Sequence, residues 1–413
     1  MTINAEFKEA LRQILWQFRA PIRYAFAYGS AVFPQSATQS TSATTTSGGT
    51  ASAWKEKGKM IDLIFGVSHT QHWHSLNLQQ HRNHYSFLGS LGSGLVSRVQ
   101  DKWGAGVYFN PFVTVNGTLI KYGVVNLDTL CKDLSRWDTL YLAGRLQKPV
   151  KILRDDARVR LANQINLISA LRTALLLLPP KFDERQLYGA IAGISYMGDP
   201  RMSLPTENPQ KVANIVRHQL THFRRLYAPL IETLPNVSFN DPRCSQRLWE
   251  DDPTTIAELV QDMDPIKRGN MVRRLPISFR DKLYFQYQSK FEIPRLIFDR
   301  MMEEKSDEMT TRINRRQGGR FEQSIAKDEE GLRGEVAGVI RKTIKGPSTS
   351  QSLKGMVTAG PSKTWRYLRE KSQKYHEGQG TRVSDEAQAA SASQGTDSGA
   401  LVEALKEDKQ KQA

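Results

Sequence analysis

The sequence predicts an α/β domain built on a mixed sheet, followed by a mainly helical domain and a basic, amphipathic C-terminal region. Segments 24–30 and 60–67 are short runs of aromatic and aliphatic residues, which indicates two buried strands. An Asn-Gly pair between the apolar runs 107–115 and 119–125 indicates a hairpin of two further strands. From Leu161 onward the apolar residues recur at helical spacing, so the next region is expected to be mainly helical.

Helices are expected where apolar residues repeat every three or four positions, at 5–19, 183–194 and 209–233. The acidic residues Glu6 and Glu9 argue against a targeting role for the first helix. A stripe of six aliphatic residues predicts a buried helix that ends at two prolines: Leu161, Ile165, Ile168, Leu171, Leu175 and Leu178. Polar residues within this stripe exclude a membrane span.

The chain has 413 residues, a net charge of +16 and two cysteines. The length favours two or more domains with a sizeable core. Cys131 and Cys244 form no CxxC pair and cannot build a disulfide framework, which favours a reducing compartment. The positive charge indicates an anionic partner, which is nucleic acid, an anionic membrane or a phosphorylated substrate. Charge alone does not choose among these three.

One acidic residue, Asp62, interrupts the second apolar strand. A carboxylate there is costly unless it is paired or binds a metal, so Asp62 is expected to meet a cation. Gly29 allows close backbone approach after the first strand, and Ser30 offers a hydroxyl and an N–H group to a phosphate. This layout is typical of a nucleotidyltransferase, although an ordinary turn beside a paired core aspartate gives the same pattern. Ile64 stands where such sites usually carry a second carboxylate.

Eight blocks of sequence are informative when taken together: YGSAVFPQ, MIDLIFGV, WHSLNLQQHRNHYS, GAGVYFNP, IKYGVV, LYLAGRLQKPVKIL, IAGISYMGDPRM and STSQSLKGMVTAG. The first seven follow one another between residues 28 and 202, and the last spans 348–360. In this order they resemble the mitochondrial phosphatidate cytidylyltransferase family of the fungal type, also called the translocator assembly and maintenance family. The common order is far more specific than any single block.

The resemblance implies transfer of CMP from CTP to phosphatidic acid, which gives CDP-diacylglycerol and pyrophosphate for cardiolipin synthesis. It implies Mg²⁺ as the cofactor and an anionic membrane surface as a partner, with no nucleic acid. The expected location is the matrix side of the mitochondrial inner membrane, as a peripheral protein. The resemblance and the composition divide the chain into five expected regions. The first two are a nucleotidyltransferase-like domain at 1–155, with a low-complexity loop at 34–53, and a winged-helix-like helical domain at 156–260. A basic helical extension at 261–330, an amphipathic membrane-binding region at 331–376 and a disordered tail at 377–413 follow.

The resemblance also assigns roles to single residues. Asp62 is expected to hold Mg²⁺, and Ser30 and Lys121 to act with it in catalysis. The nucleotide is expected to contact Tyr28, Gly29, Ser30, Lys121, Tyr122, Arg145 and Lys148. The substrate site is expected to be shaped by His74, Asn77, His84, Tyr85, Asp199 and Arg201. Further metal ligands are sought among the distant carboxylates Asp128, Asp133 and Asp199.

Plainer interpretations of the same residues stay open. Lys121 also fits an edge-strand lysine, and Arg145 and Lys148 also fit a solvated basic turn between Gly144 and Pro149. The histidines between 69 and 84 match no zinc motif, so they are not assigned to a metal.

The C-terminal region 331–376 carries 10 Lys or Arg against 2 Glu. Its apolar stripe consists of Leu332, Val336, Ile340 and Ile344. A basic amphipathic helix of this kind is expected to lie on an anionic membrane, although packing against the protein's own core gives the same stripe. The expected membrane contacts are Leu353, Met356, Trp365, Arg366, Leu368 and Arg369.

Two other function classes remain open. One is a nucleotidyltransferase that acts on RNA or protein, which the basic charge would serve through backbone contacts. The other is a membrane-associated assembly factor that keeps the fold without the activity, and Ile64 in place of a second carboxylate is the argument for it. Turnover of labelled nucleotide with a panel of acceptors separates the three classes.

Overall fold

The computed structural model describes residues 5–33, 60–202, 210–245, 249–300 and 318–360, together with Trp365 and Arg369. Residues 1–200 and 212–364 form one compact unit, and residues 201–211 and 365–413 form a second. Three expectations lie outside the described residues: the loop at 34–53, the tail at 377–413, and the membrane contacts Arg366 and Leu368. The domain boundaries stay predictions.

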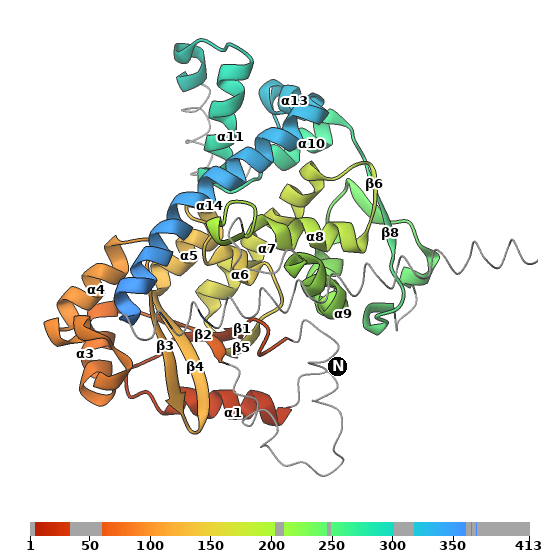
Figure 1. The fold of residues 1–413 in the computed structure, drawn as a ribbon. Helices are drawn as coiled ribbons and strands as arrows, with labels where there is room; N and C mark the ends of the chain where they lie inside the picture. Colours follow the sequence, from red (N-terminus) through yellow and green to blue (C-terminus); the bar gives the residue numbers. More distant parts are fainter. Residues whose placement is uncertain are drawn as a thin grey trace, which may run out of the picture. The chain divides into compact units, whose positions relative to one another are not determined.

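A five-stranded mixed sheet lies at the centre of the first unit, in the order β3-β4-β2-β1-β5 (Figure 1). Strands β2 and β4 are parallel, and the other neighbours are antiparallel, so the expected mixed sheet is confirmed. Asn116 and Gly117 both adopt positive φ, at 49° and 75°, as a two-residue hairpin turn requires. The strands are β1 (Tyr24–Tyr28), β2 (Ile61–Val67), β3 (Val107–Val115), β4 (Thr118–Asn126) and β5 (Lys151–Arg154).

Helices cover both faces of this sheet and build the rest of the chain. The expected helices at 5–19, 161–178, 183–194 and 209–233 are all present, with slightly different ends. No helix among the described residues is long and apolar enough to cross a membrane. The helices are α1 (Ala5–Trp16), α3 (Thr70–Gln80), α4 (Ser93–Lys102), α5 (Leu127–Arg136), α6 (Ala143–Leu146), α7 (Ala157–Leu177), α8 (Glu184–Ile194), α9 (Lys211–Glu232), α10 (Pro265–Arg273), α11 (Ile277–Lys290), α13 (Arg320–Lys327) and α14 (Glu329–Ala359).

The two faces of the sheet belong to separate apolar clusters. Because side chains alternate along a strand, Leu63 and Tyr122 point to one face, where they pack with residues of α1 and α3. Ile64 and Phe109 point to the other face, where they join the main core of α5, α6 and α7. The sheet therefore separates two environments, and the position of a residue in its strand decides which one it enters.

A second sheet follows α7. It is antiparallel, in the order β6-β8-β7, and consists of β6 (Lys181–Asp183), β7 (Val237–Phe239) and β8 (Glu258–Gln261). A fully buried ion pair between Arg224 of α9 and Glu184 of α8 ties these elements together, with Nη2 and Oε2 2.6 Å apart. Glu184 also accepts the hydroxyl of Tyr188 at 3.1 Å and the backbone N–H of Ala257 at 3.0 Å. These extra bonds satisfy a carboxylate that would be costly to bury with one partner.

The aliphatic stripe expected to bury α7 does so only in part. Leu171 and Leu175 are buried, but Leu161 and Ile165 are exposed, at 63% and 42%. The early turns of the helix lie against α5 and bury Val159 and Ala162. Leu161 and Ile165 line an open pocket beside α5. The prediction that the whole stripe is buried was therefore wrong at its N-terminal end.

Asp133 organises the turn between α5 and α6. Its Oδ1 accepts the backbone N–H groups of Thr139 and Leu140 at 2.9 and 3.0 Å. Its Oδ2 accepts those of Leu142 and Ala143 at 2.9 and 3.1 Å. One buried carboxylate thus satisfies four backbone donors that begin a short helix, as an N-cap residue does for its own helix.

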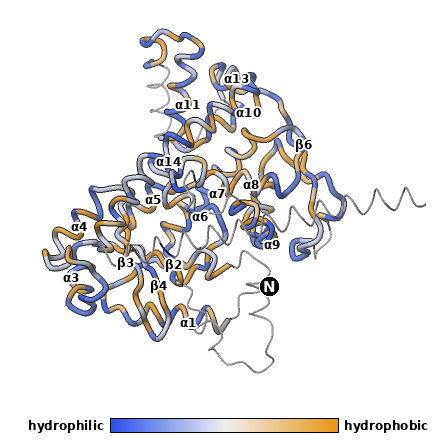
Figure 2. The backbone as a smooth tube through the Cα atoms, viewed as in Figure 1, coloured by the Kyte–Doolittle hydropathy of each residue, from blue (hydrophilic) through white to orange (hydrophobic). Residues whose placement is uncertain are grey.

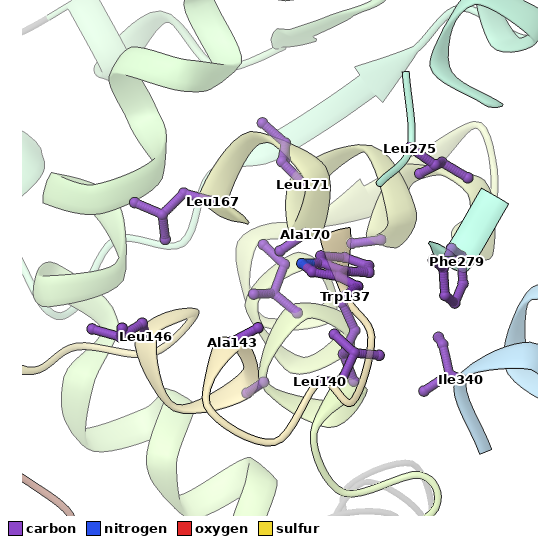
Figure 3. Packing of buried hydrophobic residues seen from close by; sticks show 14 of the residues in the cluster. Trp137, Leu140, Ala143, Leu146, Leu167, Ala170, Leu171, Leu275, Phe279 and Ile340 are labelled. Atoms are coloured by element: carbon purple, nitrogen blue, oxygen red, sulfur yellow. The ribbon is translucent and has the colours of Figure 1, made fainter. Parts of the chain in front are cut away.

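The same turn places a large aromatic side chain in the core. Trp137 and Leu140 adopt left-handed backbone conformations, with φ of 60° and 57°, which are uncommon for residues other than glycine. The Trp137 ring packs among Leu171, Phe279 and neighbouring aliphatic residues (Figure 3). Its indole N–H donates to Asn166 of α7 at 2.9 Å. Two effects offset the unfavourable left-handed backbone conformation at Trp137: burial of the indole ring and the hydrogen bond of its N–H group.

The C-terminal helix α14 is part of the main core. Its expected membrane stripe, Leu332, Val336, Ile340 and Ile344, is buried against the core cluster. Both hydrophobic and hydrophilic residues occur along this helix, as the amphipathic pattern required (Figure 2). The prediction that this stripe faces a membrane was therefore wrong, because packing against the protein's own core uses the same periodicity.

The last turns of α14 dock on the loop before β3. Gln351 accepts the backbone N–H of Ala105 at 3.2 Å and donates to the carbonyl of Val107 at 3.0 Å. Lys354 is fully buried and donates to the carbonyls of Gln100, at 3.2 Å, and Trp103, at the end of α4. A cation at a helix C-terminus is favourable, yet burial lowers the pKa of Lys354 to about 7.

Removal of the Asp133 side chain is expected to destabilise the protein strongly. Asp133→Ala leaves four backbone N–H groups without their acceptor, and we expect a loss of about 3–5 kcal/mol in the free energy of unfolding. Urea unfolding measures this loss. Asp128→Ala changes an exposed aspartate on the same helix and serves as the matched control. Equal stability of the two variants would contradict the role of Asp133.

Lys354 is expected to make stability depend on pH. Its folded pKa of about 7 lies below the ordinary 10.5, so between these values the unfolded chain binds a proton that the folded chain has released. Stability therefore rises with pH through this window, by at most about 1.4 kcal/mol per pH unit. Urea unfolding from pH 7 to 10 should show this rise in the wild type and in the exposed control Lys345→Met. Lys354→Met should lack it, and identical slopes in all three proteins would refute the assignment.

Candidate active site

Asp62 and Lys121 face each other across the parallel strands β2 and β4. The Asp62 Oδ1 and the Lys121 Nζ lie 3.8 Å apart, and both side chains are partly exposed. The expectation that the lone strand carboxylate meets a cation is therefore confirmed. Lys121 also lies over the ring of Phe109, with its Nζ 4.7 Å from the ring centre. Solvent screens a partly exposed ion pair of this kind, so it contributes little to stability.

Gly29 follows β1 and leaves space beside the Asp62 carboxylate. Its φ is +87°, and a Cβ at this position would lie 3.3 Å from the Asp62 Oδ2. The Gly29 carbonyl accepts the N–H groups of Val32 and Phe33 at 3.1 and 2.9 Å, so the chain turns directly after the strand. Ser30 lies in this turn and is partly exposed. Any larger residue at position 29 would strain the backbone and crowd the carboxylate.

Arg145 of α6 joins this group through aromatic rings. Its guanidinium carbon lies 4.0 Å from the ring centre of Tyr141 and 5.5 Å from that of Tyr28. It also donates to the backbone carbonyl of Tyr141. Burial raises the pKa of Tyr28, Arg145 and Lys121 oppose this rise, and Asp62 adds to it. The Tyr28 hydroxyl therefore stays protonated at neutral pH and can act as a hydrogen-bond donor, not as a base.

Lys148 lies one turn beyond Arg145. Its Nζ donates to the Ser195 hydroxyl at 2.6 Å and to the carbonyl of Gly144, and it lies 5.1 Å from the ring centre of Tyr196. The predicted basic turn is thus anchored to the segment that follows α8. Asp199 ends that segment and is buried. Arg201 belongs to the second unit, so its place in the site stays a prediction.

The other residues expected at the site lie on the opposite face of the sheet. Tyr122 follows Lys121 in β4 and is fully buried, and its hydroxyl accepts from Asn77 Nδ2 at 3.0 Å and lies 2.9 Å from His84 Nδ1. Asn77 also donates to the Tyr85 hydroxyl at 2.9 Å, which lies 2.8 Å from His74 Nδ1. The structure therefore does not bring these five side chains together with Asp62. Direct contact between them and a substrate stays a prediction.

This second cluster is a buried hydrogen-bonded network. His74 is fully buried, and its Nε2 lies 2.7 Å from the Gln100 Oε1. Burial lowers the pKa of His74 to about 4, so the ring is neutral at physiological pH. A neutral, fully enclosed imidazole suits a structural role, in which the network fixes the strand that carries Lys121.

Asp62 is the residue best placed to hold a metal ion. No group of three His, Cys, Asp or Glu side chains gathers in metal-binding geometry anywhere in the described ranges. Of the distant carboxylates considered, Asp128 pairs with Arg158 at the surface, and Asp133 is bonded to backbone N–H groups. Ile64 is fully buried, so its position offers no second ligand.

Sequence reasoning missed four residues that contact the predicted cations: Phe109, Tyr141, Ser195 and Tyr196. All four stand inside the sequence blocks that carried the resemblance. Their presence in these blocks was the one sequence feature that linked them to the candidate site. It could not assign a partner to Phe109, Ser195 or Tyr196, because these contacts join separate segments of the chain. Tyr141 lies only four residues before Arg145, so that contact was open to sequence reasoning.

Comparison with known proteins gives a consistent result. Residues 11–374 match a family described as mitochondrial phosphatidate cytidylyltransferase. A protein of that name from Schizosaccharomyces pombe is 41% identical over 270 residues, which cover 65% of this chain and 64% of the relative. One from Saccharomyces cerevisiae is 45% identical over 249 residues, or 59% and 60% of the two chains. One from Danio rerio is 35% identical over 369 residues, or 89% and 94%.

The matched residues span less than two thirds of the length of each yeast relative. The family match nevertheless extends from α1 to the region beyond α14 and includes every residue of the Asp62, Lys121 and Arg145 group. The chain belongs to the mitochondrial phosphatidate cytidylyltransferase family.

Proposed function

We propose that the protein transfers CMP from CTP to phosphatidic acid and releases pyrophosphate and CDP-diacylglycerol. The observation that carries this proposal is the group of Asp62, Lys121 and Arg145 on one face of the sheet, next to the turn at Gly29, in a chain of this family. Two cations and an exposed backbone turn suit a triphosphate, and a carboxylate suits the metal ion that accompanies it. The central sheet then corresponds to a nucleotidyltransferase-type domain, and the region from α7 to β8 to a winged-helix-like one.

The reaction needs positioning and charge neutralisation. A phosphate oxygen of phosphatidic acid attacks the α-phosphorus of CTP, a new P–O bond forms, and the bond to the pyrophosphate leaving group breaks. Lys121, Arg145 and Lys148 neutralise the triphosphate, while the backbone at Gly29 and Ser30 approaches its oxygens. The protonated hydroxyl of Tyr28 donates a further hydrogen bond.

Asp62 would hold Mg²⁺, and the space that Gly29 leaves beside the carboxylate fits this role. The bound ion would neutralise charge on the nucleotide phosphates. Mg²⁺ commonly takes one or two protein carboxylates and completes its shell with water and phosphate oxygens. A single carboxylate is therefore sufficient for this ion.

We place the activity at the matrix side of the mitochondrial inner membrane, where CDP-diacylglycerol would serve cardiolipin synthesis. The relatives carry mitochondrial names, which supports the organelle. The membrane contact that we propose lies on α14 after the buried stripe. Leu353, Met356 and Val357 are exposed there, at 49%, 43% and 42%. Lys342 and Lys345 line a shallow groove that continues from Leu353 along the same helix, so apolar and cationic groups adjoin.

The molecule that accepts CMP in the assay distinguishes the proposed reaction from two other functions. A nucleotidyltransferase for RNA or protein would transfer label from CTP to those polymers, and a non-catalytic assembly factor would turn over no nucleotide. Transfer to phosphatidic acid alone, with pyrophosphate released in equal amount, supports the proposed reaction.

Asp62→Asn is expected to lower cytidylyl transfer by at least about 100-fold and to leave the fold intact, because it removes charge with almost no change in volume. The assay follows transfer of labelled CMP to phosphatidic acid in vesicles. Asp128→Asn makes the same change at an exposed aspartate, which pairs with Arg158, and should retain full activity. Near wild-type turnover in Asp62→Asn would remove this carboxylate from the mechanism.

Charge on the exposed patch of α14 is expected to weaken membrane binding. Leu353→Glu with Met356→Glu should reduce flotation with phosphatidate-containing vesicles by about tenfold or more, because apolar contact is lost and negative charge meets an anionic surface. CTP binding should be unchanged. Leu161→Glu alters a leucine on α7 that is at least as exposed as Leu353, and it is the control. If the α14 variant and the control float alike, the membrane contact lies elsewhere.

A further inference from the structure

The ammonium group of Lys148 begins a short hydrogen-bonded chain. Its Nζ donates to the Ser195 hydroxyl at 2.6 Å, and that hydroxyl donates to the carbonyl of Ala192 at 3.2 Å. Ser195 is the residue that ends α8. Because its proton goes to Ala192, a lone pair of its oxygen faces Lys148. The hydroxyl is thus oriented to accept from the lysine.

One further contact confines the Lys148 ammonium, and close packing at Gly144 fixes the position of Ser195. The Tyr196 ring centre lies 5.1 Å from the Lys148 Nζ, within the range of a cation–π interaction. The backbone at Gly144 lies directly against Ser195, since a Cβ on Gly144 would lie 2.5 Å from the Ser195 Cβ. The segment that carries Lys148 and the end of α8 therefore meet without intervening space, and a side chain at position 144 would push them apart.

The segment 195–199 is itself held in place. The N–H groups of Tyr196 and Met197 both donate to the Gly193 carbonyl, at 2.9 and 3.1 Å. On its other side, a Cβ on Gly198 would lie 2.5 Å from the backbone oxygen of Arg341 in α14. The segment is thus packed between α6 and α14. It offers a fixed hydroxyl and a fixed ring to a flexible lysine.

We propose that Ser195 and Tyr196 are positioning residues that hold the Lys148 ammonium in place for the phosphates of CTP. This inference rests on the proposed function, because it takes CTP as the ligand of Lys148. A lysine is a point charge on a flexible stem, so groups that restrict its ammonium lower the entropy cost of binding a phosphate. Ser195 restricts the ammonium by a charge-assisted hydrogen bond, and Tyr196 restricts it by its ring face.

A double-mutant cycle on CTP affinity tests this proposal. CTP binding is measured by equilibrium dialysis for the wild type, Ser195→Ala, Lys148→Met and the double variant. We expect Ser195→Ala to weaken binding by about 3- to 20-fold, as loss of a hydrogen bond to a charged group does. In the Lys148→Met background, the same change should have no further effect, because the lysine that Ser195 positions is absent. Independent, multiplicative losses would show that Ser195 acts through the fold and would overturn the proposal.

Matched variants separate the contributions. Ser289→Ala removes an exposed helix hydroxyl on α11 and should leave CTP affinity unchanged. Tyr196→Phe keeps the ring and should bind CTP more tightly than Tyr196→Leu, which removes it; equal affinities of these two variants would reject the ring contact. Urea unfolding shows that each variant is folded. Failure of the wild type to bind CTP would reject the proposed function, whereas binding without coupling between Ser195 and Lys148 would reject this inference alone.

Discussion

The hydrogen bonds between Asp133 and the turn that follows α5 determine how the candidate site is built. Four backbone N–H groups converge on this carboxylate, and they fix the start of α6 and the left-handed conformation of Leu140. The same turn buries Trp137 against α7 and α11 (Figure 3). Arg145 and Lys148 follow within two turns of this anchor, so the contact of Arg145 with Tyr28 of β1 and that of Lys148 with Ser195 depend on it. A structural carboxylate in the core therefore positions the cations that we propose to neutralise the nucleotide phosphates.

Side chains alternate along β4, so neighbouring residues of the block IKYGVV face the candidate site and the buried network in turn. Lys121 points to the face with Asp62, whereas Tyr122 points to the buried network with Asn77 and His84. The network restrains β4 on the face opposite Lys121, through the contacts of Asn77 and His84 with the Tyr122 hydroxyl. This arrangement restrains the backbone at Lys121 without placing any polar group of the network in the site. We propose that residues on both faces serve one reaction, because those beside Asp62 would contact the nucleotide while the network holds the strand that carries Lys121.

The sequence was sufficient for the mixed sheet, the hairpin at Asn116 and the Asp62–cation pair, because strand periodicity, turn chemistry and the cost of a lone charge are local signals. It was insufficient where one pattern has two outcomes. The stripe from Leu332 to Ile344 fits a membrane or a core equally well, and only tertiary packing decides. Alternation in β4 could have separated Tyr122 from Lys121, but the resemblance grouped them in one block. The contacts of Ser195 and Tyr196 with Lys148 join distant segments and have no local signature.

The packing around Ile64 explains why this face of β2 carries one carboxylate at the candidate site. Ile64 is fully buried, and a Cβ on Gly123 would lie 2.8 Å from its Cδ1 and 2.6 Å from the ring of Phe109. A carboxylate at position 64 would be buried in this apolar contact without a partner, at a cost of several kcal/mol. The proposed acceptor makes such a residue unnecessary, because a phosphate monoester has a second pKa of about 6 and is already ionised near neutral pH. A hydroxyl acceptor would need a base besides the metal ligand, and the apolar packing around Ile64 leaves no place for a second carboxylate at position 64.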